Sequence, residues 1–138
     1  MTKRLSLWLL GSLLIVLLAA CNLTTPDNLP TPIPTPDLPR VEIIDPPNNV
    51  QVYENTEFNF DIVARDETQG ISWLVLLVDG AEINQARPQD AETVEVFRVT
   101  MNWRTSELGN HAVEAIAYRA DGTQSDPAVL NVEVIARP

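Results

Sequence analysis

The chain has 138 residues, which is enough for one ordinary domain with short appendages and too few for two domains with separate cores. Nine Lys and Arg residues stand against 19 Asp and Glu, giving a net charge of −10, so the chain lacks the clustered cations that nucleic-acid binding requires. A hydrophobic content of 45% with three Trp residues excludes wholesale disorder.

The first 20 residues have the pattern of an export signal. Lys3 and Arg4 precede an apolar run from Leu5 to Ala20. As a helix, this run of 16 residues would span about 24 Å, which is short of the roughly 30 Å hydrocarbon core that a transmembrane helix must cross. We therefore interpret residues 1–20 as a signal peptide and not as a permanent membrane span.

The run ends with Leu18-Ala19-Ala20-Cys21, which resembles the cleavage site of bacterial lipoprotein signal peptides. The resemblance implies cleavage between Ala20 and Cys21, after which Cys21 becomes a lipidated N-terminus. It also implies a location in the cell envelope, outside the cytoplasm, with the protein attached to a membrane through the lipid anchor. A plain signal peptide with a chance cysteine and an uncleaved signal anchor are the two alternatives.

Cys21 is the only cysteine in the chain, so no intrachain disulfide can form. For the same reason, the folded part can contain neither a thiol nucleophile nor a cysteine zinc cluster. Two or three acyl chains on Cys21 would make the attachment durable, because each buried CH₂ contributes about 0.8 kcal/mol and one chain alone binds only marginally.

A proline-rich segment follows the lipidation site. Residues 22–39 contain six prolines interleaved with Thr and Asp. Because proline fixes φ and pushes the preceding residue toward an extended conformation, helices and central strands are excluded here. We interpret residues 21–39 as the lipidated cysteine and a disordered linker that holds a domain away from the membrane. A PxxP ligand from Pro36 to Pro39 is the alternative.

From Arg40 to Pro138 the apolar residues recur with a period of two, which indicates β-strands. The Asp79-Gly80 pair is a strong signal for a two-residue hairpin turn. About seven short strands without a helical period predict an all-β domain, an antiparallel β-sandwich over residues 40–138. Trp103 ends one alternating run and is expected to be largely buried between the sheets. The strand segments cover residues 41–44, 50–53, 58–65, 71–78, 81–86, 94–103, 111–118 and 129–135.

Several short motifs follow one another in this domain. In chain order they are Leu74-x-Leu76-x-Val78-Asp79-Gly80, Trp103, Gly109-x-His111-x-Val113-x-Ala115-x-Ala117, Asp121-Gly122 and Val132-x-Val134. The ordered set is similar to the bacterial immunoglobulin (Ig)-like modules of cell-surface proteins, over essentially all of residues 40–138. The resemblance implies an Ig-like antiparallel β-sandwich in a surface setting and names no reaction. The chain departs from antibody-type domains by lacking both core cysteines.

The sequence favours a protein that is not an enzyme and that holds no metal or cofactor. His111 is the only histidine, and its place at the start of a strand beside Gly109 favours a hydrogen-bonded structural role. A glycosidase-type pair of carboxylates is not excluded by the sequence, but a domain of this size leaves little room for a substrate cleft. Calcium binding would need clustered loop acids, and no D-x-D-x-D spacing occurs among Asp66, Glu67, Asp79, Asp121 and Asp126.

One predicted strand, residues 71–78, is apolar on both faces. With its even-numbered residues from 74 onward facing inward, Trp73, Val75 and Leu77 must face outward. An outward apolar stripe has to be covered, either internally by a loop such as residues 87–92 or by the linker, or by a partner or a second copy. These three residues are therefore the candidate interaction surface.

Three functions are compatible with these features. The favoured one is a membrane-anchored extracytoplasmic lipoprotein that presents one Ig-like module for binding a protein or a cell-envelope component. The second is a passive structural or accessory envelope lipoprotein. The third is a carbohydrate-binding module, which is the weakest because it needs coplanar exposed aromatic rings, for which only Trp73, Tyr53 and Tyr118 are candidates.

Overall fold

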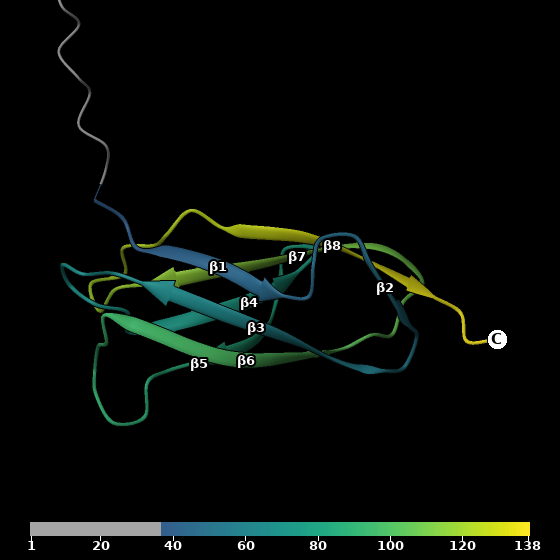
Figure 1. Cartoon of the computed structure of the whole chain (residues 1–138), viewed down its shortest axis with the longest axis horizontal. Helices are drawn as coiled ribbons and strands as arrows, with labels where there is room; N and C mark the ends of the chain where they lie inside the picture. The colour runs from purple at the N-terminus through teal and green to yellow at the C-terminus, as the bar shows by residue number, and fades with distance from the viewer. Residues whose placement is uncertain (1–36) are drawn as a thin grey trace, which may run out of the picture. The chain divides into compact units, whose positions relative to one another are not determined.

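The computed structural model describes residues 37–138, and their regular secondary structure consists of β-strands alone (Figure 1). None of these residues belongs to a helix that could cross a membrane. The predicted signal peptide, its cleavage site at Ala20 and Cys21, and the linker up to residue 36 lie outside the described residues. The strands are β1 (Arg40–Asp45), β2 (Val50–Tyr53), β3 (Glu57–Arg65), β4 (Trp73–Val78), β5 (Ala81–Ala86), β6 (Val96–Arg104), β7 (Gly109–Tyr118) and β8 (Ala128–Ile135).

The eight strands form two sheets that pack face to face. The smaller sheet has three strands in the order β1-β3-β6, and the larger has five in the order β2-β8-β7-β4-β5. Figure 1 shows the strands of both sheets running mainly along the long axis of the domain. The prediction of an all-β sandwich is confirmed, with eight strands where about seven were expected.

The hydrophobic core lies between the sheets and follows the alternation visible in the sequence. On β3, Phe60 and Ile62 are almost fully buried, while the intervening Asn59 and Asp61 are exposed. Burying one large apolar side chain stabilises a fold by about 1.5–3 kcal/mol. The buried cluster consists of Val52, Phe60, Ile62, Ala64, Ile71, Leu74, Leu76, Val78, Met101, Val113, Ala115, Ala117, Leu130, Val132 and Val134.

A two-residue turn joins β4 to β5, as the Asp79-Gly80 pair predicted. Asp79 and Gly80 have φ values of 50° and 79°, and a type I′ hairpin turn requires positive φ at both central positions. Aspartate adopts this left-handed region more readily than most non-glycine residues, and glycine does so without steric cost. The sequence therefore determines both the position of this turn and its type.

One strand pair departs from the antiparallel pattern, because β2 pairs with β8 in parallel. The chain crosses from the smaller sheet to the larger between β1 and β2, and in Figure 1 it keeps its direction as it does so. It therefore reaches β8 running the same way as that strand. Asn48 and Asn49 hold the crossing: Asn131 N–H donates to the Asn48 side chain at 2.8 Å, and Asn49 N–H donates to the Asn131 carbonyl at 2.9 Å.

Trp103 is less buried than the sequence predicted. It packs against the core cluster but remains half-buried, with its ring 5.2 Å from the His111 ring in an edge-to-face arrangement. The expectation of a largely buried Trp103 is wrong because β6 is an edge strand, and a side chain near the end of an edge strand is covered on fewer sides.

The last residues of the proline-rich segment belong to the folded domain. Pro39 is almost fully buried, and Oδ2 of Asp37 lies 3.2 Å from Nη2 of Arg119. Oδ2 of Asp37 also lies 3.1 Å from the Thr68 hydroxyl oxygen. The ordered contacts of the domain therefore begin before β1.

Candidate functional site

The three residues of the candidate interaction surface lie on β4, on the face that points away from the core. Leu74, Leu76 and Val78 belong to the core cluster, as predicted, and the intervening residues do not. Val75 is nevertheless only 6% exposed, while Trp73 and Leu77 are half-buried. Side-chain neighbours on the same outer face must therefore cover Val75.

The cross-strand register identifies these neighbours on β7 and β8. Trp73 pairs with Tyr118, Val75 with Ile116 and Leu77 with Glu114. Glu114 in turn pairs with Val129 on β8, and Val129 is 54% exposed. The apolar surface is thus wider than the sequence predicted, and we call it the outer stripe: Trp73, Val75, Leu77, Ile116, Tyr118 and Val129.

Both faces of the Trp73 indole are occupied. Tyr118 stacks on it, with ring centroids 4.9 Å apart and an interplanar angle of 6°. The Arg87 guanidinium carbon lies 5.1 Å from the indole centroid. Since β7 and the β5 segment flank β4 on opposite sides, these two groups cover opposite ring faces. A sugar ring has no free indole face on which to stack, and Tyr53 lies on the far edge strand β2.

The loop that follows β5 borders the outer stripe at its Trp73 end. A hollow of about 270 Å³ lies between the indole and this loop. Arg87 is thus the loop residue that covers Trp73, whereas the rest of the loop leaves an open depression beside it. The hollow is lined by Ser72, Trp73, Arg87, Pro88, Ala91, Glu92 and Ala120.

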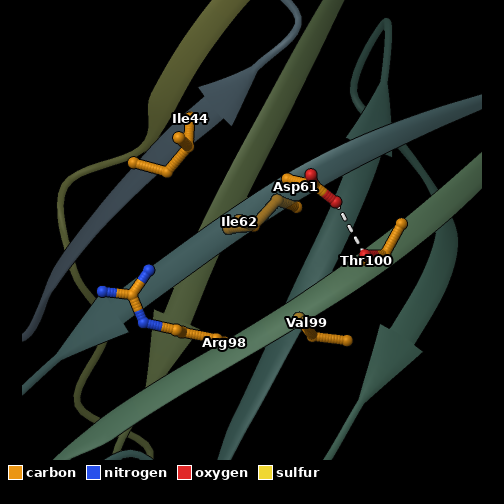
Figure 2. Close-up of a pocket in the computed structure, with 6 residues that line it drawn as sticks. All are labelled: Ile44, Asp61, Ile62, Arg98, Val99 and Thr100. Atoms are coloured by element: carbon orange, nitrogen blue, oxygen red, sulfur yellow. Dashed lines mark hydrogen bonds between the residues drawn. The ribbon is translucent and has the colours of Figure 1, made fainter.

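A second hollow, of about 330 Å³, lies on the smaller sheet (Figure 2). The Thr100 hydroxyl donates to Oδ1 of Asp61 at 2.6 Å, so these two polar groups satisfy each other. Figure 2 shows Ile44 on one side of this pair and the extended Arg98 side chain on another. Ile44 is 53% exposed because the β1–β3 register shifts between Ile43 and Asp45. The arrangement holds no group of three or more metal-ligating side chains, and neither does the rest of residues 37–138.

His111 has the hydrogen-bonded position that the sequence predicted. Its Nδ1 lies 2.6 Å from Oδ2 of Asp79, and its Nε2 lies 2.9 Å from the carbonyl oxygen of Glu107. The hydrogen bond to Asp79 raises the pKa of His111, and the same bond lowers the pKa of Asp79. Asp79 also accepts from Ala112 N–H at 2.9 Å, so the histidine ties the β4–β5 turn to β7.

A buried ion pair was missed by the sequence analysis. Arg119 and Asp66 are 4% and 5% exposed, and their side chains meet through two contacts, Nε to Oδ2 at 2.5 Å and Nη2 to Oδ1 at 3.2 Å. Thr68 supports the pair: its hydroxyl accepts from Arg119 at 2.9 Å and donates to Asp66 at 2.7 Å. The hydrogen bond from Arg119 holds the pKa of Asp66 far below its ordinary value.

The loop acids considered as calcium ligands are therefore used separately. Asp66 pairs with Arg119 and Asp79 pairs with His111. Asp121 accepts a hydrogen bond from the backbone N–H of Thr123 at 2.9 Å inside its own turn, which lowers the pKa of Asp121. Asp126 is exposed. Asp66, Asp79 and Asp121 therefore each serve a local structural role.

Two face-to-face sheets of three and five strands define an Ig-like β-sandwich. Residues 37–138 contain no cysteine, so no disulfide joins these two sheets. No family model matches the chain, and no curated protein shows significant similarity to it. Solved structures do share the fold. The fibronectin(III)-like modules of Clostridium thermocellum CbhA are 28% identical, with a TM-score of 0.60, and the match covers 72% of this chain and 100% of theirs.

Two archaeal domains give the same picture of the fold at lower sequence identity. The CARDB domain of PF1109 from Pyrococcus furiosus, solved in complex with di-metal ions, is 15% identical with a TM-score of 0.53, covering 75% of this chain and 100% of that domain. The PKD domain of an M14-like peptidase from Thermoplasmatales archaeon SCGC AB-540-F20 is 18% identical with a TM-score of 0.50, and the match covers 70% of this chain and 92% of that domain. Residues 37–138 thus form an all-β domain with the Ig-like sandwich fold that fibronectin III-like and PKD domains share.

Proposed function

We propose that this protein is a membrane-anchored lipoprotein that presents one Ig-like module outside the cytoplasm, where the module binds another molecule without catalysing a reaction. In this proposal the lipid is attached at Cys21 after cleavage behind Ala20. The proline-rich linker separates the anchor from the domain, and the outer stripe is the binding surface.

The apolar character of the outer stripe, with Val129 54% exposed and Trp73, Leu77, Ile116 and Tyr118 half-buried, is the observation that carries the proposal. The outer face of a sandwich strand normally alternates toward polar residues, yet this face presents Trp73, Ile116, Tyr118 and Val129 around the covered Val75. Aromatic anchors on a contiguous apolar patch are typical of protein interfaces. Asp66 and Asp79 are held in structural ion pairs with Arg119 and His111.

Carbohydrate binding is a less favoured alternative. A sugar site needs an exposed ring face, and both faces of Trp73 are occupied by Tyr118 and Arg87. A protein surface requires no free ring face, because it can contact the ring edges and the aliphatic side chains beside them. The geometry therefore favours a protein partner for the outer stripe.

A matched pair of positions tests the proposal in the full-length chain in intact cells. Val129 on the outer stripe and Ile44 on the smaller sheet are exposed aliphatic residues with exposed fractions of 54% and 53%. We expect a photo-crosslinking amino acid at Val129 to give specific protein adducts and the same amino acid at Ile44 to give none. Equal adducts from both positions, or none from Val129, would argue against the outer stripe as the binding surface.

A further inference from the structure

The charged residues beside the outer stripe are distributed unevenly between its two ends. At the Trp73 end, the Arg87 guanidinium lies over the indole. At the Leu77 end, Leu77 pairs with Glu82 on β5 and with Glu114 on β7. The stripe therefore has a cation, Arg87, at its Trp73 end, where Glu92 also lines the hollow, and only carboxylates at its Leu77 end.

Arg87, Glu82 and Glu114 have no ion-pair partner within residues 37–138. The ion pairs of that part of the chain are formed by His111 with Asp79 and by Arg119 with Asp37 and Asp66. Arg87, Glu82 and Glu114 take part in none of them. Unpaired charges at the border of an apolar patch are available for pairing across an interface, where complementary charges fix the register.

We propose that the outer stripe binds the outer stripe of a second copy of this chain, about a two-fold axis. The inference rests on the proposed role of this stripe as a binding surface. Two sheets that pack face to face lie about 10 Å apart with interdigitating side chains. The axis lies in the plane between the two facing sheets. Within that plane it runs across the strands, at right angles to them, and passes over Val75.

The cross-strand register dictates which residues such an axis brings together. It leaves each strand opposite the same strand of the second copy and exchanges the two ends of the stripe. Arg87 then faces Glu82 of the second copy, and Tyr118 faces Glu114 of the second copy. Trp73 faces Leu77 of the second copy, and every contact occurs twice because the interface is isologous.

A two-fold axis parallel to the strands gives a poorer match. It would place β4 over β7 of the second copy, so that Glu114 faces Leu77 and Glu82 faces Val129. Glu82 would then lose water without gaining a cation, whereas the perpendicular axis places it opposite Arg87, and an uncompensated buried charge is strongly unfavourable. Glu114 faces an uncharged side chain under either axis. The charge pattern therefore selects the axis perpendicular to the strands.

Charge reversal tests the pairing in the full-length protein. Two differently tagged copies are expressed together, solubilised from membranes in detergent, and measured by co-purification and by sedimentation equilibrium. The variants are Arg87→Glu, Glu82→Arg and the double variant. Arg98→Glu, an exposed charge reversal on the smaller sheet, is the matched control, and thermal unfolding verifies that each variant is folded.

Each single reversal should weaken self-association by about tenfold or more, because it places like charges opposite each other twice. The double variant should regain self-association to within about threefold of the wild type, and Arg98→Glu should leave it unchanged. Mixing the two single variants should also restore association, since every opposed pair is then of opposite sign.

A wild-type chain that sediments as a monomer would overturn the dimer, as would folded single variants without rescue by the double variant. If the monomeric chain still gives adducts with another protein at Val129, the proposed binding function stands and only the second copy is wrong as the partner. If the wild-type chain dimerises but carries no acyl group at Cys21, the pairing stands and the proposed lipid anchor is wrong.

Discussion

Both ring nitrogens of His111 face acceptors, so the folded protein favours the imidazolium ion. A neutral imidazole has one N–H and would turn a lone pair toward either the Asp79 carboxylate or the Glu107 carbonyl. Protonation satisfies both contacts and places a positive charge beside Asp79. Folding and protonation of this side chain are therefore linked.

The free energy of unfolding should fall as the pH rises above neutrality. The folded pKa of His111 is raised above its ordinary value of 6.5, so its stabilisation is complete below that pH and is lost as pH rises through the folded pKa. Urea unfolding from about pH 6 to about pH 9 measures this loss, because the ordinary pKa of histidine lies within this range. His111→Gln should flatten the profile, and an equally steep profile in that variant would assign the pH dependence to another group.

Asp66 shows why the ion pair with Arg119 could not be predicted. Its partner lies 53 positions away in the chain, and no local spacing connects the two. In the sequence Asp66 stands beside Glu67 before Gly70, which is indistinguishable from an ordinary turn acid. Only the packing of the segment after β3 against the segment after β7 removes both charges from water.

The strands were predictable where one face is buried and the other is polar. The apolar residues at alternate positions from Phe58 to Ala64 and from Leu130 to Val134 all lie in the core or pack against it. The outer stripe was predicted only in part, because Trp73, Val75 and Leu77 are visible along one strand whereas Ile116 and Val129 join them through strand pairing. The parallel pairing of β2 was invisible for the same reason, since a strand's own residues do not state its partner's direction.

Two turn glycines provide a comparison of backbone strain with steric crowding. Gly70 and Gly80 have φ values of 78° and 79°, so alanine pays a similar conformational penalty at either position. A Cβ at Gly80 would have no neighbour within 4 Å, whereas a Cβ at Gly70 would lie 3.0 Å from Cβ of Thr93.

We expect Gly80→Ala to lower the free energy of unfolding by about 1 kcal/mol and Gly70→Ala to lower it by about 2–3 kcal/mol. Urea denaturation of both variants measures the difference. Equal losses would mean that the segment around Thr93 moves aside without cost, so that the turn before β4 is held less tightly than its geometry indicates.

At the scale of the whole molecule, the proposed function depends on one atom outside the described residues, Sγ of Cys21. Metabolic labelling with a fatty-acid probe should mark the wild-type protein, and Cys21→Ser should remain unlabelled and lose its membrane attachment. Labelling that persists in the serine variant would remove the lipoprotein proposal. The folded domain would be unaffected, because residues 37–138 contain no cysteine.

The contacts of Asp37 and Pro39 determine how the domain would respond to tension in the linker. A pull on the linker reaches the domain first at the ion pair between Asp37 and Arg119 and at the buried ring of Pro39. Beyond them the load passes to β1, whose strand runs along the long axis of the domain (Figure 1). The β1–β3 hydrogen bonds from Arg40 to Asp45 are then loaded together in shear, and shear resists rupture better than the opening of one bond at a time. Tension along this axis would therefore be resisted first by the Asp37–Arg119 ion pair and then by the β1–β3 hydrogen bonds.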